Sequence, residues 1–100
     1  MQEIPSATIA RARVIVDSFG PAFAEAGDLI NPVSEGVVTT DHYRDELGML
    51  VAGEVAGRSN PDQITFFKSV GNAVQDVVVA KLAFERATAA GIGSPVDLYA

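Results

Sequence analysis

Few side chains in this 100-residue sequence are of the types that do chemistry, and the clearest group is Lys68-Ser69-Val70. Lys68 beside Ser69 suggests a Ser-Lys pair, but neighbouring residues of a strand point to opposite faces, which argues against a joint role. Two roles therefore remain for Ser69. Its hydroxyl can cap the helix that follows, which is a complete explanation and is favoured, or it can contact a ligand.

The other candidates also favour structural roles. His42 is the single histidine and lies on the polar side of a helix start, without partners for a metal site or a triad. Asp41, Asp45 and Glu46 indicate a solvated helix face, because hard cations need several converging oxygens. Asp17 ends a strand, a position that suits a catalytic carboxylate, yet a structural or solvent-facing role is favoured. We assign no catalytic residue and no metal ligand.

Composition limits the class of protein. The chain is 48% hydrophobic and 20% charged, which indicates one small folded domain. Thirteen acidic and seven basic residues give a net charge of −6, so neither nucleic acid nor a membrane surface is expected as a partner. Cysteine is absent, which excludes disulfides and thiolate chemistry. No apolar run is long enough for a membrane span and no secretory signal is visible, so a cytoplasmic location is expected.

The elements that position Ser69 lie in residues 64–91. The run from Ile64 to Phe67 predicts a short strand, and a long helix follows with Ser69 as its N-cap. Gly91 ends that helix as a residue free to adopt a left-handed conformation. Apolar residues occupy most of the helix circumference between Val74 and Phe84, so we expect a buried helix, either central in the core or packed against a second chain.

The earlier part of the chain predicts more helices and one strand. A helix capped by Ser6 is expected through residue 12, followed by a strand at residues 13–17 whose β-branched residues suit a parallel sheet covered on both faces. A helix from Pro21 is stopped by Asn31-Pro32, and a third helix runs from about Thr40 to residue 53. The expected order is α-β-α-α-β-α. Two strands are too few for a free-standing sheet, so further strands are expected from elsewhere.

Several motifs together resemble a known family. They are A-R-V-I-V-D at residues 12–17, E-A-G-D-L at 25–29, E-L-G at 46–48, and I-T-F-F-K-S-V-G at 64–71 followed by Gln75-Asp76. In order and spacing they resemble the C-terminal part of the ornithine cyclodeaminase / mu-crystallin family. The resemblance extends over nearly the whole chain, and the run from Thr65 to Asp76 is its most specific part.

The resemblance implies a larger NAD(P)-dependent protein with a Rossmann-type domain and a second domain for substrate binding and dimerisation. Cyclodeaminases, amino-acid dehydrogenases and ketimine reductases belong to this family of amino-acid metabolism. On this basis the chain is an incomplete Rossmann-type α/β fragment, with residues 1–30 at the edge of the Rossmann-type domain and residues 64–100 in the dimerisation and substrate domain. Ser69 maps to a cofactor-binding serine and Val70 to a substrate-binding valine.

Departures from the family leave activity open. No G-x-G-x-x-G turn occurs, because Gly91-Ile92-Gly93 follows a helix, and the family's catalytic residues lie upstream of the matched motifs. One hypothesis is therefore a segment of an NAD(P)-dependent deaminating or imine-reducing enzyme, inactive alone and binding neither NAD nor NADP by itself. The alternative is a non-catalytic module that forms homo-oligomers through residues 74–84. A small-ligand pocket between protomers is a weaker third hypothesis.

Overall fold

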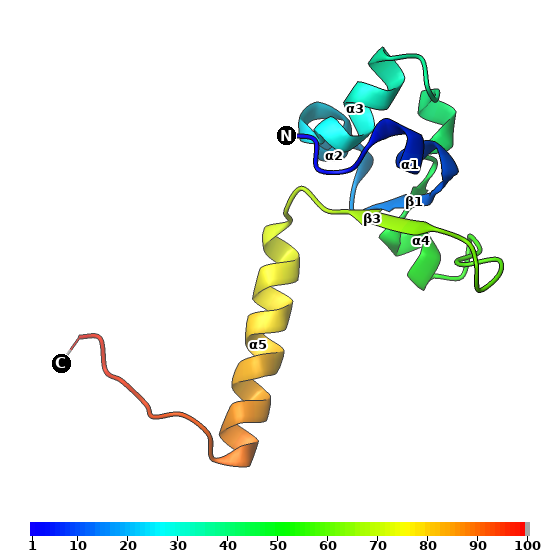
Figure 1. Cartoon of the computed structure of the whole chain (residues 1–100). Helices are drawn as coiled ribbons and strands as arrows, with labels where there is room; N and C mark the ends of the chain where they lie inside the picture. Colours follow the sequence, from blue (N-terminus) through cyan, green and yellow to red (C-terminus); the bar gives the residue numbers. More distant parts are fainter. Residues whose placement is uncertain (100) are drawn as a thin grey trace.

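The computed structural model describes residues 1–99, and a small parallel sheet lies at the centre of its body (Figure 1). The strands are β1 (Arg13–Val16), β2 (Asp45–Glu46) and β3 (Thr65–Lys68), in the order β2-β1-β3. Both neighbours run parallel to β1, with Val16 opposite Glu46 on one side and opposite Lys68 on the other. The predicted α/β class is confirmed, with a three-stranded sheet as its centre.

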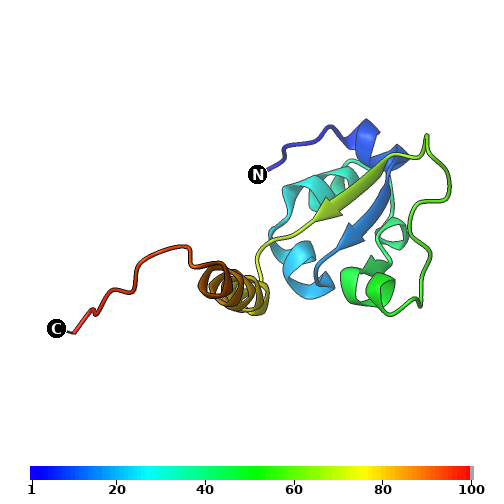
Figure 2. The same cartoon turned by 90° about the horizontal axis from the view of Figure 1, so that it is seen from below.

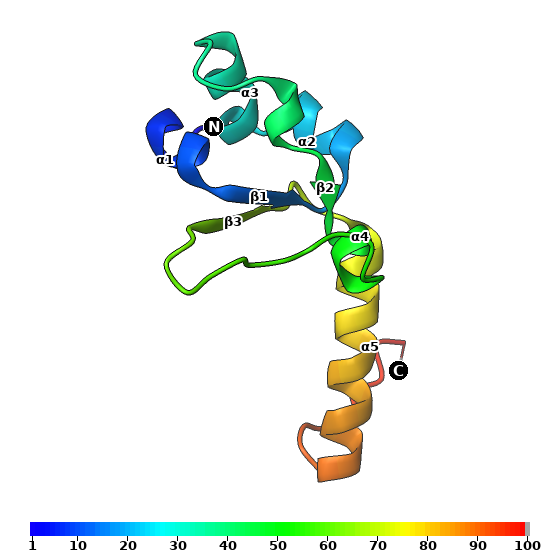
Figure 3. The same ribbon diagram turned by 90° about the vertical axis from the view of Figure 1, so that its right-hand side faces the viewer.

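Helices cover the two faces of this sheet unequally. Helices α1 (Ser6–Arg11), α2 (Phe19–Glu25) and α3 (Gly27–Ser34) lie on one side. A 3-10 turn, η1 (Thr40–His42), leads to β2, and the short helix α4 (Leu47–Val51) lies on the other side (Figure 3). The long helix α5 (Ala73–Ala90) follows β3.

The hydrophobic core fills the space between the sheet and α1 to α3. Val14 and Val16 point into it from β1, whereas Ile15 points to the opposite face, as the two-residue period of a strand requires. The fully or almost fully buried members of this core are Ile9, Ala12, Val14, Val16, Ala22, Ala26, Leu29 and Tyr43. Among residues 1–99, α4 and the loop before β3 lie above the face that carries Ile15.

Helix α5 is not buried, which corrects the expectation drawn from its apolar circumference. It extends away from the body as an isolated rod in Figure 1 and is seen nearly end-on beside the body in Figure 2. Its side chains face solvent all round. Val74 is 67% exposed, Val78 59% and Phe84 72%. Apolar residues surround this helix instead of forming one stripe, so the helix has no single face to lay on the sheet. Of the two expected arrangements, the central core helix is wrong for this chain.

The predicted helix boundaries after β1 were wrong. The expected helix from Pro21 is two helices, α2 and α3, broken at Ala26 where the backbone is extended, and Pro32 lies inside α3 instead of stopping it. The backbone of Met1 passes so close to Gly27 that a Cβ there would lie 2.5 Å from the Met1 carbonyl oxygen. The N-terminal segment therefore crosses the chain at this break.

The expected third helix is replaced by η1, β2 and α4. Tyr43 is 1% exposed in the core, and the chain then pairs Asp45 with Ile15, which requires an extended backbone. The expected count of two strands was consequently wrong. The third strand comes from this chain itself.

Helix caps differ from the sequence expectation at the start of α1 and α5. Pro5 occupies the N-cap of α1, so Ser6 is not its cap. The cap of α5 is Asn72, whose side-chain oxygen accepts a hydrogen bond of 3.0 Å from the Val74 N–H. Ser69 is therefore not the cap. Gly91 ends α5 with φ at 67°, as predicted.

Candidate site at the carboxyl ends of β1 and β3

Asp17 and Ser69 are brought together because β1 and β3 are parallel neighbours. Each residue directly follows its strand, and the register that pairs Val16 with Lys68 places the next residues side by side. The Ser69 hydroxyl donates a hydrogen bond of 2.7 Å to Oδ2 of Asp17, and the Val70 N–H donates one of 3.2 Å to the same oxygen. One carboxylate oxygen thus fixes two consecutive residues of the β3–α5 connection.

The environment of Asp17 favours its ionised form. Burial raises the pKa of this carboxyl, but hydrogen bonds from the Ser69 hydroxyl and from the Ser18 and Val70 N–H groups outweigh it, so the pKa lies below its usual value. Asp17 is therefore an anion at neutral pH. An ionised acceptor of this kind organises donors around it and is not poised to exchange a proton.

A second carboxylate holds the residue just before Ser69. Asp28 is completely buried, and its Oδ1 accepts the N–H groups of Glu3 at 2.6 Å and Ile4 at 2.8 Å. Its Oδ2 lies 2.8 Å from Nζ of Lys68, which also reaches a Glu3 carboxylate oxygen at 3.3 Å. Burial raises the pKa of Asp28, and Lys68 with the two N–H groups lowers it by more, so this carboxyl is also ionised.

Residues 68 to 70 are thus held one after another by Asp28 and Asp17, while the Ser69 side chain remains exposed. Val70 is half-buried against the core. The result is a short, fixed stretch of backbone that offers one exposed hydroxyl at the carboxyl edge of a parallel sheet, the edge where ligands of open α/β sheets bind. The geometry supports binding and orientation, because Asp17 holds the Ser69 hydroxyl and the Val70 N–H in fixed positions.

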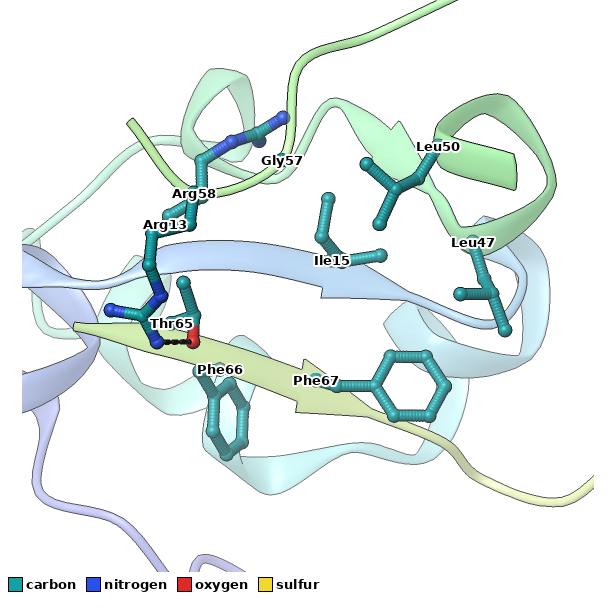
Figure 4. Close-up of a pocket in the computed structure, with 9 residues that line it drawn as sticks. All are labelled: Arg13, Ile15, Leu47, Leu50, Gly57, Arg58, Thr65, Phe66 and Phe67. Atoms are coloured by element: carbon teal, nitrogen blue, oxygen red, sulfur yellow. Dashed lines mark hydrogen bonds between the residues drawn. The ribbon is translucent and has the colours of Figure 1, made fainter. Parts of the chain in front are cut away.

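A hollow of about 380 Å³ lies on the other face of the sheet (Figure 4). Ile15 and Phe67 form its floor, with Leu47 and Leu50 of α4 on one side. Phe66 contributes only at the margin, because its ring points away toward the opposite face. The lining is completed by Arg13, Gly57, Arg58 and Thr65.

The two arginines of this hollow are occupied by the protein itself. Arg13 forms an ion pair of 2.5 Å with Asp45 and donates to the Ala56 carbonyl at 2.8 Å. Arg58 donates to the Thr65 hydroxyl at 2.7 Å and to the Gln63 carbonyl. Their guanidinium groups tie the loop between α4 and β3 to the sheet, so they are not poised for an anionic ligand.

The other sequence candidates are dispersed. His42 has its Nε2 2.9 Å from the Ile9 carbonyl oxygen, and since a carbonyl only accepts, Nε2 donates. Asp41 pairs with Arg44, and Glu46 accepts the Phe19 N–H at 2.9 Å. Within residues 1–99 no group of three or more potential ligands is placed to hold a metal ion. In the same residues, no helix is long and apolar enough to cross a bilayer.

Parallel strands, an adjoining helical layer and a polar carboxyl edge define the class of Rossmann-like α/β proteins. The chain belongs to the ornithine cyclodeaminase/mu-crystallin family, whose family model matches residues 1–91. The family predicted from the motifs is therefore confirmed. Whether the chain corresponds to the C-terminal part of family members stays a prediction.

Curated relatives with matching sequences include reductases and dehydrogenases. A Delta(1)-pyrroline-2-carboxylate reductase of Bacillus cereus is 47% identical over 97% of this chain and 30% of its own length. An alanine dehydrogenase of Archaeoglobus fulgidus is 33% identical over 98% of this chain and 30% of its own length. The chain therefore spans about 30% of the length of these relatives.

Solved structures are similar over the same extent. The Thermococcus litoralis Delta(1)-pyrroline-2-carboxylate reductase in complex with NADH and L-proline superimposes with a TM-score of 0.78 at 43% identity, covering 95% of this chain and 29% of that one. An archaeal alanine dehydrogenase dimer with bound NAD gives a TM-score of 0.70 at 33% identity, covering 98% and 30%. These similarities confirm the Rossmann-like character of the fold.

Proposed function

We propose that this chain is a segment of an NAD(P)-dependent enzyme that reduces the C=N bond of a cyclic imino acid. The observation that carries the proposal is the 47% identity to a Delta(1)-pyrroline-2-carboxylate reductase over nearly the whole chain. The similar Thermococcus reductase holds NADH and L-proline, the amino acid that reduction of such an imine yields. The sequence alone left deamination and imine reduction equally open, and these relatives favour reduction.

Within that enzyme, Ser69 would contact the cofactor and Val70 the substrate. Their fixed position at the carboxyl edge of the sheet supports these roles, because both residues are held by Asp17 before any ligand arrives. The division of the chain between two domains, at residues 1–30 and 64–100, is proposed on the same basis. In the isolated chain we expect no turnover, because no G-x-G-x-x-G turn occurs in its sequence and the resemblance places the family's catalytic residues upstream of the matched motifs. Its cytoplasmic location remains a prediction.

A hybrid enzyme tests this function directly. The matching segment of the Bacillus cereus reductase is replaced by this chain, and oxidation of NADH or NADPH is followed with Delta(1)-pyrroline-2-carboxylate as substrate. We expect imine-dependent oxidation by the hybrid and none by the isolated chain. A folded hybrid that binds the cofactor yet leaves the imine unreduced would contradict the proposal.

Self-association through α5 is a second candidate function, favoured by the exposure of this helix. A rod with Val74, Val77 and Val79 each about two-thirds exposed is unusual for a soluble monomer, and a second copy of the chain would cover it. The similar archaeal alanine dehydrogenase is a dimer. Light scattering on the purified chain, with and without NADH, tests this candidate. We expect a dimer or larger species, and a monodisperse species of 10.5 kDa at micromolar concentration would exclude it.

A further inference from the structure

The hydrogen-bonding polarity of the Ser69 hydroxyl is fixed by its two protein partners. An ionised carboxylate has no hydrogen to donate, so Ser69 donates its single hydrogen to Oδ2 of Asp17 across 2.7 Å. A backbone N–H only donates, so Oγ of Ser69 accepts from the Gly71 N–H across 3.3 Å. Neither bond can reverse its direction while Asp17 is ionised.

One lone pair of Ser69 is left for an incoming ligand. A hydroxyl oxygen carries two acceptor positions, and the Gly71 N–H uses one of them. The side chain of Ser69 is exposed, so the second position is accessible from solvent. Donation to an anion also increases the negative charge on Oγ, which strengthens the bond that this oxygen accepts.

We propose that Asp17 is a positioning residue that makes Ser69 a hydrogen-bond acceptor toward its ligand, so that the ligand group facing Ser69 is an N–H donor. This inference rests on the proposed function. In that reaction two ligands carry a suitable N–H: the carboxamide of the nicotinamide ring, and the protonated imine of the substrate. A ligand carboxylate would meet the lone pair of Ser69 and be repelled.

The same contacts explain why an aspartate is needed and an asparagine is not equivalent. Oδ2 accepts from both the Ser69 hydroxyl and the Val70 N–H, and Oδ1 accepts the Ser18 N–H at 2.8 Å. The side-chain oxygen of an asparagine can accept either from Ser69 and Val70 or from Ser18, but not from both groups of donors. If its amide nitrogen faces Ser69, it opposes the Val70 N–H and turns the serine hydrogen outward, which reverses the polarity offered to the ligand.

The role of Asp17 is tested first on the chain itself. In two-dimensional NMR spectra, the Val70 amide proton should shift as Asp17 titrates, with a midpoint below the ordinary aspartate value of 3.8. The shift should vanish in Asp17→Asn and persist in Asp62→Asn, an exposed aspartate of the loop before β3. A Val70 amide that does not follow an acidic titration in the unsubstituted chain would overturn the positioning role.

The ligand chemistry is tested in the hybrid reductase. Ser69→Ala should lower kcat/KM with NADH about tenfold, the equivalent of about 1.4 kcal/mol. Asp17→Asn should lower it at least as much, because Asp17 also holds the Val70 N–H, and the double variant should lose no more than Asp17→Asn alone, because Ser69 acts through its bond to Asp17. A merely structural aspartate would instead give additive losses.

A cofactor analogue separates the two N–H donors. In the acetylpyridine analogue of NADH the carboxamide nitrogen is replaced by a methyl group, so no N–H is present there. If Ser69 faces the carboxamide, the loss caused by Ser69→Ala should disappear with this analogue; if it faces the imine, the loss should remain. Unchanged kcat/KM for Ser69→Ala with both cofactors would overturn the inference.

Failure of the proposed function would be recognised separately. An unsubstituted hybrid that binds NADH without reducing the imine would refute the reductase assignment and the imine as the N–H donor, whereas the Val70 titration judges the role of Asp17 independently of any activity.

Discussion

Replacing the buried carboxylate of Asp28 should remove a large part of the stability of this chain. In Asp28→Asn, the oxygen that accepts the Glu3 and Ile4 N–H groups can be kept, but an amide NH₂ then faces the Lys68 ammonium at the 2.8 Å contact. Removing one partner of a buried ion pair costs about 3–5 kcal/mol. Lys68 is 18% exposed and can still reach Glu3, so we expect the lower value, about 3 kcal/mol.

That loss is measurable because a chain of this length is stable by roughly 5–15 kcal/mol. Urea unfolding followed by far-UV circular dichroism should show a lower midpoint with an unchanged slope. The control is Asp62→Asn, which removes the same charge from an exposed loop and should change stability by less than about 0.5 kcal/mol. A loss for Asp28→Asn as small as that of the control would refute the reasoning, because Asp28 would then not hold Lys68.

Three further predictions concern pH, a buried hydroxyl and α5. Because folding lowers the pKa of Asp28, the stability that this carboxylate contributes is complete above the ordinary pKa of 3.8 and is lost as the pH falls below it. Because folding raises the pKa of Lys68, the stability that this ammonium contributes is complete below the ordinary pKa of 10.5 and is lost as the pH rises above it. Urea unfolding midpoints measured over the acidic and the alkaline pH range check both dependences. In Asp28→Asn the midpoint should fall less steeply as the pH is lowered. Tyr43→Phe should leave stability unchanged or raise it by up to about 1 kcal/mol, because the buried Tyr43 hydroxyl has no hydrogen-bond partner within residues 1–99 and burial raises its pKa to about 12. A loss above about 1 kcal/mol in thermal unfolding would show that this hydroxyl is satisfied. Val78→Asp should reduce the oligomer mass in light scattering without unfolding the body, whereas Val51→Asp, on the exposed end of α4, should not; equal masses for both would argue against assembly through α5.

Much of the fold could be predicted from local sequence patterns. The β-branched run at β1, the aromatic run at β3 and the capping glycine at Gly91 each carry a strong local signal, and the structure places these elements within a few residues of their predicted positions. Strand β2 carries no such signal, because it consists of Asp45 and Glu46 alone. Its extended backbone is imposed by pairing with β1, which no local pattern reveals.

The sequence indicated some residues of the site but not the contacts between them. Ser69 and Val70 were singled out through the family resemblance, and Asp17 was noticed as a strand-terminal carboxylate without a partner. Its contact with Ser69 depends on β1 and β3 being adjacent, parallel and in a register that aligns their ends. Asp28 belonged to one of the family motifs but received no role, because its burial results from the N-terminal segment crossing the chain beside Gly27.

The order of the strands also has a consequence for synthesis. The central strand β1 precedes its partner β3 by 52 residues, the separation between Asp17 and Ser69. At about 5–20 residues per second, roughly 3 to 10 s pass before β3 can pair with it. During that interval the edge of β1 that later pairs with β3 lacks this partner, and an unpaired strand edge can pair with another chain. Asp17 and Asp28, which fix the β3–α5 connection, both precede β3 in the sequence. Their carboxylates are therefore already synthesised when β3 pairs with β1.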